Sequence, residues 1–127
     1  MTAHQGLPIY REAIRLVMHL HQCTRKAPRD LRHTLVQRLL DESVQACVHI
    51  AMANKADKRD RADTIASLSA TIARIDVLLT VAREQRCLSI GAAAVAMEHV
   101  DALGKQAHGW GRHTTSHSGK PESEPST

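Results

Sequence analysis

The chain has 127 residues, and its only Phe, Tyr or Trp residues are Tyr10 and Trp110 among 43% apolar residues. This length suits a single domain, and a core of aliphatic side chains favours helices over sheets. Residues 1–112 carry 16 basic and 11 acidic side chains, so this part has a surplus of +5 within a chain of net charge +4. Such a surplus suits an acidic partner, either nucleic acid or an acidic protein face.

The two ends of the chain differ in composition from its middle. Residues 1–6 form a short lead-in, and residues 113–127 form a tail rich in Ser, Thr, Gly, Pro and charge with no apolar period. Such segments bury too little apolar surface to become ordered, so we expect both to be disordered. The folded domain is therefore expected over residues 7–112.

Two helices are expected in the first half of this domain. The first begins at about Pro8, which suits a first helical turn, and ends near Pro28. Its apolar residues recur at helical spacing: Ile9, Ala13, Leu16, Val17 and Leu20. The second begins just after Pro28 and ends at Asn54, with Asp30 at its positive N-terminal end. Its expected apolar face is Leu31, Leu35, Leu39, Val44, Cys47 and Ile50.

Two further helices follow, and the third has the clearest pattern. Its apolar residues step by three and four, as in a packing seam: Ile65, Leu68, Ile72, Ile75, Leu79 and Ala82. Asp57 is its expected cap, and the polar run 83–86 ends it. The fourth opens at the cap Ser89, is expected to break at residues 109–111, and uses Ile90, Ala94, Met97, Val100 and Leu103. Because the connections are short, we expect an antiparallel up-down-up-down four-helix bundle.

The histidines and cysteines do not form a recognisable catalytic or metal motif. Glu98 and His99 are adjacent and lack the Glu-x-x-His spacing of di-iron bundles. Near the C-terminus, His108, His113 and His117 are close in sequence but would hold a metal only loosely. We therefore expect no enzyme activity, no cofactor and no metal site.

The cysteines and the N-terminus indicate in which cellular compartment the protein is expected. Cys23, Cys47 and Cys87 are far apart and sit in apolar patterns, which is typical of inert packing in a reducing compartment. No signal peptide opens the chain, and no segment approaches the roughly 20 uninterrupted apolar residues of a membrane span. A cytoplasmic protein without membrane contact is the expectation.

The basic residues form two groups. One surrounds the first connection and the start of the second helix: Arg25, Lys26, Arg29, Arg32 and Arg38. The other surrounds the second connection: Lys55, Lys58, Arg59 and Arg61. Three aspartates, Asp57, Asp60 and Asp63, dilute this second group, so the first is the better candidate for phosphate contacts. With almost no aromatic rings to stack on bases, such contacts would be directed at the backbone.

Several segments resemble a known family. Lys26–Leu39 is similar to the segment "FPK…RYTLGQRL" of small bacterial four-helix-bundle proteins, with Ala27 in place of an aromatic residue and His33 in place of tyrosine. Further matches are residues 53–55, residues 86–89, and Asp101-x-x-Gly104-Lys105 with Gly109-Trp110. These resemble the accessory variability determinant (Avd) proteins of diversity-generating retroelements, and the related bundle proteins encoded in ribosomal-RNA intervening sequences.

The resemblance implies a function and an assembly. It implies a pentameric ring with a basic surface that binds the element's reverse transcriptase and associates with template RNA or cDNA during mutagenic retrohoming. The residues it assigns to this binding are Lys26, Arg29, Arg32 and Arg38, with Lys55 as a fifth. The alternative is an intervening-sequence type of bundle that serves self-assembly or protein interaction without binding nucleic acid.

Overall fold

The computed structural model describes residues 3–119, with side chains over residues 4–113. All regular structure in that range is helical, which confirms the all-α prediction. Four long helices are present there: α1 (Pro8–Cys23), α3 (Leu35–Lys55), α4 (Lys58–Glu84) and α5 (Ile90–Gly119). Two short elements accompany them, a 3-10 helix η1 (Ala3–Gly6) and the single-turn helix α2 (Arg29–Arg32).

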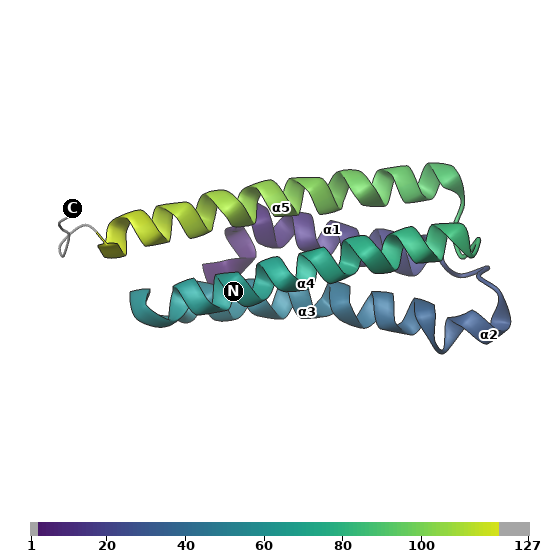
Figure 1. The fold of residues 1–127 in the computed structure, drawn as a ribbon, viewed down its shortest axis with the longest axis horizontal. Coiled ribbons are helices and arrows are strands. Elements are labelled where there is room, and N and C mark those ends of the chain that lie inside the picture. Colours follow the sequence, from purple (N-terminus) through teal and green to yellow (C-terminus); the bar gives the residue numbers. More distant parts are fainter. Residues whose placement is uncertain (1–2, 120–127) are drawn as a thin grey trace.

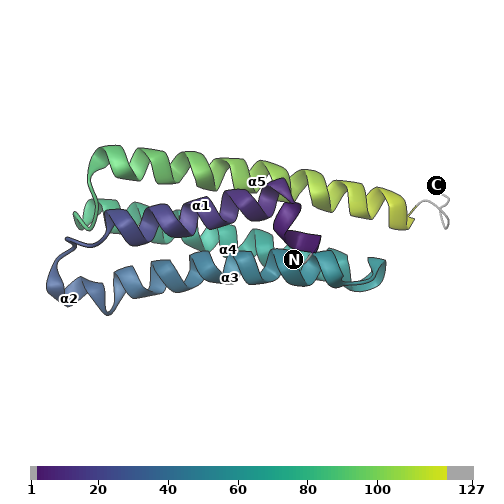
Figure 2. The same ribbon diagram turned by 180° about the vertical axis from the view of Figure 1, so that it is seen from behind.

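The long helices lie side by side along one axis (Figures 1 and 2). Helices α1 and α4 run toward the end that carries α2, and α3 and α5 run away from it. We call this end, residues 24–34 and 83–90, the α2 end, and we call the opposite end, residues 53–61, the far end. The connections from α1 to α2 and from α4 to α5 thus share one end of the bundle, although more than fifty residues separate them in sequence.

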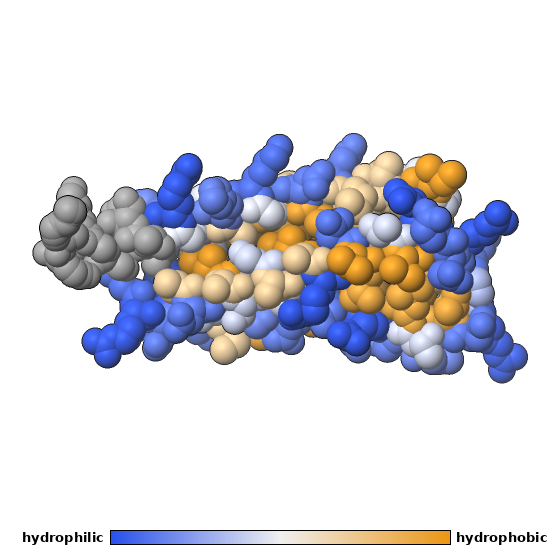
Figure 3. All heavy atoms as spheres, viewed as in Figure 1, coloured by the Kyte–Doolittle hydropathy of each residue, from blue (hydrophilic) through white to orange (hydrophobic). Residues whose placement is uncertain are grey.

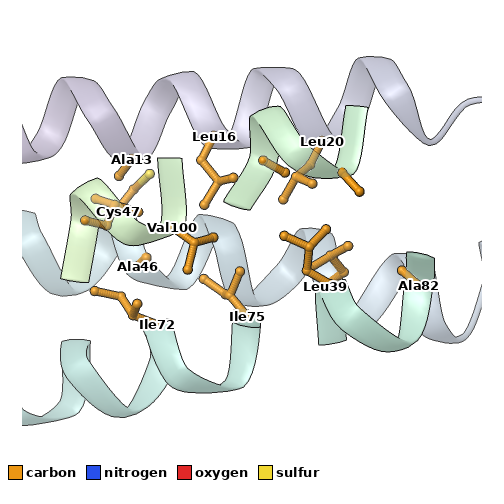
Figure 4. Close-up of a cluster of buried hydrophobic side chains, with 14 of the residues drawn as sticks. Ala13, Leu16, Leu20, Leu39, Ala46, Cys47, Ile72, Ile75, Ala82 and Val100 are labelled. Atoms are coloured by element: carbon orange, nitrogen blue, oxygen red, sulfur yellow. The ribbon is translucent and has the colours of Figure 1, made fainter. Parts of the chain in front are cut away.

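The core is aliphatic and runs along the bundle axis. All six residues of the predicted seam on α4, from Ile65 to Ala82, are buried. Figure 4 shows Ile72 and Ile75 of this seam in one cluster with Leu16 and Leu20 of α1, Leu39 of α3 and Val100 of α5, which lie at successive levels along the bundle. Each buried large aliphatic side chain contributes about 1.5–3 kcal/mol before conformational entropy opposes it.

Helix α4 is long and apolar enough to cross a membrane. The core helix of a soluble protein can have the same length and composition. The seam of α4 faces the other helices, and Arg74 near its middle pairs with Glu42 of α3 at 3.1 Å. These are the contacts of a central bundle helix.

The prediction of a single continuous second helix is wrong. It is divided into α2 and α3, because Thr34 adopts φ −120° and ψ −92°, outside the helical region. The Thr34 hydroxyl donates to the carbonyl of Asp30 at 3.2 Å, the kind of local bond that competes with a helix. After this break Val36 is buried and Leu35 is only half-buried. Val44, predicted for the buried face, is exposed, and Ser43 takes its place with its hydroxyl bonded to the Leu40 carbonyl.

The predicted end and face of the last helix also need correction. α5 continues through Gly109 and Gly111 to Gly119, past the expected domain boundary at residue 112. Gly111 allows a close approach, since a Cβ there would lie 3.3 Å from a methyl of Ile65. The buried stripe is Ala93, Ala96, Val100, Leu103 and Ala107, whereas the expected Ile90 and Ala94 are exposed.

Parts of the two terminal segments belong to helices in the structure. Residues 3–6, placed in the lead-in, form η1, and residues 113–119, placed in the tail, belong to α5. Residues 120–127 of that tail lie outside the described residues, as do Met1 and Thr2.

Candidate nucleic-acid and partner interface

The turn after α1 holds Arg25 and Lys26 outward. Thr24 is buried, and its hydroxyl donates to the Leu20 carbonyl at 2.7 Å, which satisfies an acceptor at the end of α1. Ala27 is 1% exposed and belongs to the core. With the chain anchored on both sides, Arg25 and Lys26 between them face solvent. Neither side chain has a hydrogen bond or ion pair within the described residues.

The remaining predicted residues of this group differ in the contacts that their side chains make within the fold. Arg29 is exposed and, among the described residues, has no side-chain partner. Arg32 donates from Nε to the Ala27 carbonyl at 3.0 Å, so part of its guanidinium closes the turn. Arg38 lies 3.5 Å from Glu42, a carboxylate that also accepts from Arg74 at 3.1 Å. Arg38 is thus part of an α3–α4 bridge rather than a residue held ready for a ligand.

The connection between α4 and α5 adds cations that the sequence did not assign to the site. α4 ends with the Arg86 amide bonded to the Arg83 carbonyl and the Cys87 amide bonded to the Ala82 carbonyl. This is a Schellman motif, in which the residue after the cap is left-handed and is usually glycine. Arg86 occupies that position with φ 61°, the only non-glycine positive φ among the described residues. Beyond it Cys87 and Leu88 are buried, and the Ser89 hydroxyl caps α5 by accepting from the Ala92 amide at 3.0 Å.

These two connections enclose a groove of about 1100 Å³ at the α2 end. Arg25 and Lys26 of the first connection line it, together with Arg83 and Arg86 from the end of α4. Glu84 is the one carboxylate in its lining, and it lies 3.5 Å from Arg83. The pKa of the Cys87 thiol, which also lines the groove, is raised by burial and further by the charge of Asp30.

Arg83 and Arg86 were visible in the sequence only as the polar end of a helix. The signal that could have found them is topological, because antiparallel helices bring the first and third connections to one end. Lys55, the sixth predicted residue, is exposed at the far end, so the structure separates it from the other five.

The basic residues of the far end are partly used within the fold. Arg61 donates from Nε to the Ala53 carbonyl at 3.0 Å and from a terminal nitrogen to the Ala56 carbonyl at 3.1 Å. It thereby caps the last turn of α3. Asp57 accepts from the Asp60 amide at 3.0 Å, which confirms it as the cap of α4. Arg61 and Asp57 thus stabilise the turn between two helices, whereas Lys55, Lys58 and Arg59 are exposed without a side-chain partner among the described residues.

The histidines and cysteines have structural contacts. His99 of α5 binds the carboxylate of Glu12 on α1, and His19 of α1 bonds to the Ala92 carbonyl of α5 at 2.8 Å. Burial raises the pKa of Cys47 to about 11 and that of Cys23 above its ordinary value. Within the residues that the structure describes, no group of three metal-binding side chains occurs. The side chain of His117 lies outside the described residues.

Comparison with known proteins yields one family. A family model described as bAvd-like matches residues 9–114, which is most of the chain and all four long helices in part or whole. No curated protein matches the chain.

Proposed function

The chain belongs to the bAvd-like family, and from that premise we propose that it is the non-enzymatic accessory subunit of a diversity-generating retroelement. In this role it binds the reverse transcriptase of the element and the template RNA or cDNA. The α2 end is the part of its surface that we assign to this binding.

The observation that carries this proposal is the convergence of cations from two connections. Arg25, Lys26, Arg29 and Arg86 have no carboxylate partner among the described residues and are exposed. They can therefore meet phosphates or carboxylates without first breaking an internal ion pair. Phosphate contacts release counterions, so binding of RNA should weaken steeply as salt rises.

We also propose that the protein assembles into a ring, with five subunits as the family resemblance implies. Aliphatic side chains remain exposed on outer faces, spaced by one helical turn on α3 (Val44, Val48 and Met52) and on α4 (Val77 and Val81). Figure 3 shows hydrophobic atoms gathered over the half of α4 that leads toward the α2 end, bordered by hydrophilic atoms. Packing such faces against other subunits would remove this surface from water. Light scattering on the purified protein measures the subunit number directly.

We assign no chemistry to the chain itself and place it in the cytoplasm. The raised thiol pKa values keep the cysteines protonated near neutral pH, the unreactive form. Protonated, partly or fully buried thiols suit a reducing compartment.

The test compares two matched charge reversals in protein co-expressed with the reverse transcriptase of its element. Arg25→Glu with Arg29→Glu changes the α2 end, and Lys58→Glu with Arg59→Glu changes the far end by the same charge. We expect the first pair to reduce retention of template RNA by roughly tenfold or more at moderate salt and to weaken association with the polymerase. The second pair should have a much smaller effect. Equal effects of the two pairs would contradict the assignment, and helical content by circular dichroism controls for folding.

The alternative function is a bundle for self-assembly or protein interaction alone, and the exposed aliphatic faces favour it. Under this alternative neither charge reversal changes subunit number, and the wild-type protein retains no RNA at any salt concentration. That result would remove the accessory role in nucleic-acid binding and leave the bundle.

A further inference from the structure

The groove at the α2 end has an aliphatic lining as well as cations. Its volume of about 1100 Å³ is at or above the upper limit of roughly 300–1,000 Å³ for small-molecule sites, and it is open to solvent. Leu88, Ile90 and Ala92 line it together with the four cations. A single phosphate would use little of this space, whereas an extended segment of a few residues would fill it.

Ile90 is the most exposed large aliphatic residue described, at 81%. Single exposed aliphatic residues are common on protein surfaces and need no explanation by themselves. Ile90 differs because it lines a groove together with arginines, where an apolar partner group would cover it beside charged contacts. Apolar contacts combined with charged ones are usual in protein-binding sites.

Arg86 is held in a conformation that glycine adopts without strain. A left-handed φ of 61° is unfavourable for a residue with a Cβ, and the Schellman motif normally uses glycine there. Strain of this kind persists where neighbouring structure fixes it, here through buried Cys87 and Leu88, and it is often found at functional sites. A guanidinium lining the groove gives a reason for having arginine at this position.

We propose that this groove binds a short acidic segment of a protein partner, with an aliphatic side chain packed on Ile90 and Leu88. Carboxylates of the segment pair with Arg25 and Lys26 of the first connection and with Arg83 and Arg86 from the end of α4. The inference rests on the proposed function, because it assumes that the groove is the part of the α2 end that binds the protein partner.

Nucleic acid fits the groove less well. A nucleic-acid strand would find cations but no aromatic ring in the groove lining, and its sugars and bases gain little from an exposed isoleucine.

The experiment measures fluorescence anisotropy with the full-length protein and three labelled probes. The first is a nine-residue peptide of three Glu-Asp-Leu repeats, the second has serine in place of each leucine, and the third is a ten-nucleotide oligouridylate. We expect the leucine peptide to bind about tenfold more tightly than the serine peptide, which corresponds to covering one aliphatic side chain.

The variants separate the aliphatic contact from the charge. Ile90→Ser should weaken the leucine peptide about tenfold, to the level of the serine peptide, and leave the oligouridylate unchanged. Arg86→Gly should weaken both peptides, and Arg86→Lys should restore most of the binding. Val95→Ser, an exposed aliphatic residue of α5 outside the groove lining, and Arg59→Ala at the far end are the matched controls and should change no peptide affinity.

Two outcomes overturn the inference. One is a leucine peptide that binds no better than the serine peptide, or that binds Ile90→Ser as well as the wild type. The other is a loss of oligouridylate binding in Ile90→Ser that equals the loss of peptide binding, which would make the groove a nucleic-acid site. Polymerase association and RNA retention, measured on the same wild-type protein, distinguish failure of this inference from failure of the proposed function.

Discussion

The two ends of the bundle both carry basic side chains but differ in what surrounds them. At the far end Arg61 is bonded to two carbonyls, and the exposed Lys55, Lys58 and Arg59 lie close in sequence to three aspartates, one of which, Asp57, caps the helix that begins there. At the α2 end Arg25, Lys26, Arg29 and Arg86 have no side-chain partner within the part of the chain that the structure describes. The number of basic residues near a connection therefore says little about charge available to a ligand, since hydrogen bonds inside the fold can already occupy it.

The largest expected effect that tests this contrast is on stability at the far end. Arg61→Ala removes both bonds to the last turn of α3 and leaves two carbonyls without that donor. We expect a loss of about 2 kcal/mol in the free energy of unfolding, measured in urea, because hydrogen bonds from charged groups are worth about 1.5–3 kcal/mol each and water replaces part of them. Arg25→Ala at the α2 end should change it by less than about 0.5 kcal/mol. Similar losses in the two variants would remove the contrast.

A second prediction has the opposite sign. Arg86→Gly should raise the free energy of unfolding by about 1 kcal/mol, because the left-handed backbone conformation is unfavourable for arginine and readily available to glycine. The same urea titration measures it, and Arg83→Gly, within helical α4, serves as the control and should lower stability. A destabilised Arg86→Gly variant would show that the arginine side chain contributes to folding and is not held there against its backbone preference.

A third and smaller effect concerns the helix cap of the far end. Asp57→Ala should cost about 0.5–1 kcal/mol, since the carboxylate that accepts from the Asp60 amide is lost in an exposed setting. Asp57→Ser should recover most of that loss, because serine is also a good cap. Melting temperatures of the three proteins give the ranking, and an alanine variant as stable as the wild type would count against the cap.

Much of the fold could be predicted from residue periodicity and caps. The seam on α4 is buried as its three-and-four spacing indicated, and Asp57 and Ser89 both cap the helices they precede. The division of the second helix at Thr34 was missed, because a local hydroxyl bond and the burial of Val36 outweigh a pattern that reads as one helix. The last helix was cut short at Gly109 and Gly111, residues that normally end helices but here permit contact with Ile65.

The site was predictable only in part. Arg25, Lys26 and Arg29 follow from clustering in the sequence, and the structure leaves them exposed. Arg38 was chosen for its position in the chain, and its pairing with Glu42 depends on where Arg74 of α4 falls. The left-handed conformation of Arg86 could not be predicted from the sequence, since glycine is the usual residue at such a helix end. The Arg38–Glu42–Arg74 bridge and the place of Arg86 in the groove both depend on how segments distant in sequence come together.

The smallest predicted effect concerns a histidine near the bridge that Arg38, Glu42 and Arg74 form between α3 and α4. Half-buried His49 on α3 has its pKa lowered from 6.5, first by burial and then by the charge of Arg74, against the opposing effect of Glu42. The unfolded chain therefore binds a proton more readily than the folded chain, so stability should fall as the pH drops through about 6.5 and should be fully present above it. His49→Gln removes this contribution, and exposed His33→Gln controls for the loss of a histidine. In urea unfolding at pH 5.5 and 7.5, the wild type should lose more stability on acidification than His49→Gln does. An equal loss in both proteins would mean that folding does not lower the pKa of His49, and neither its burial nor the charge of Arg74 would then contribute to the pH dependence of stability.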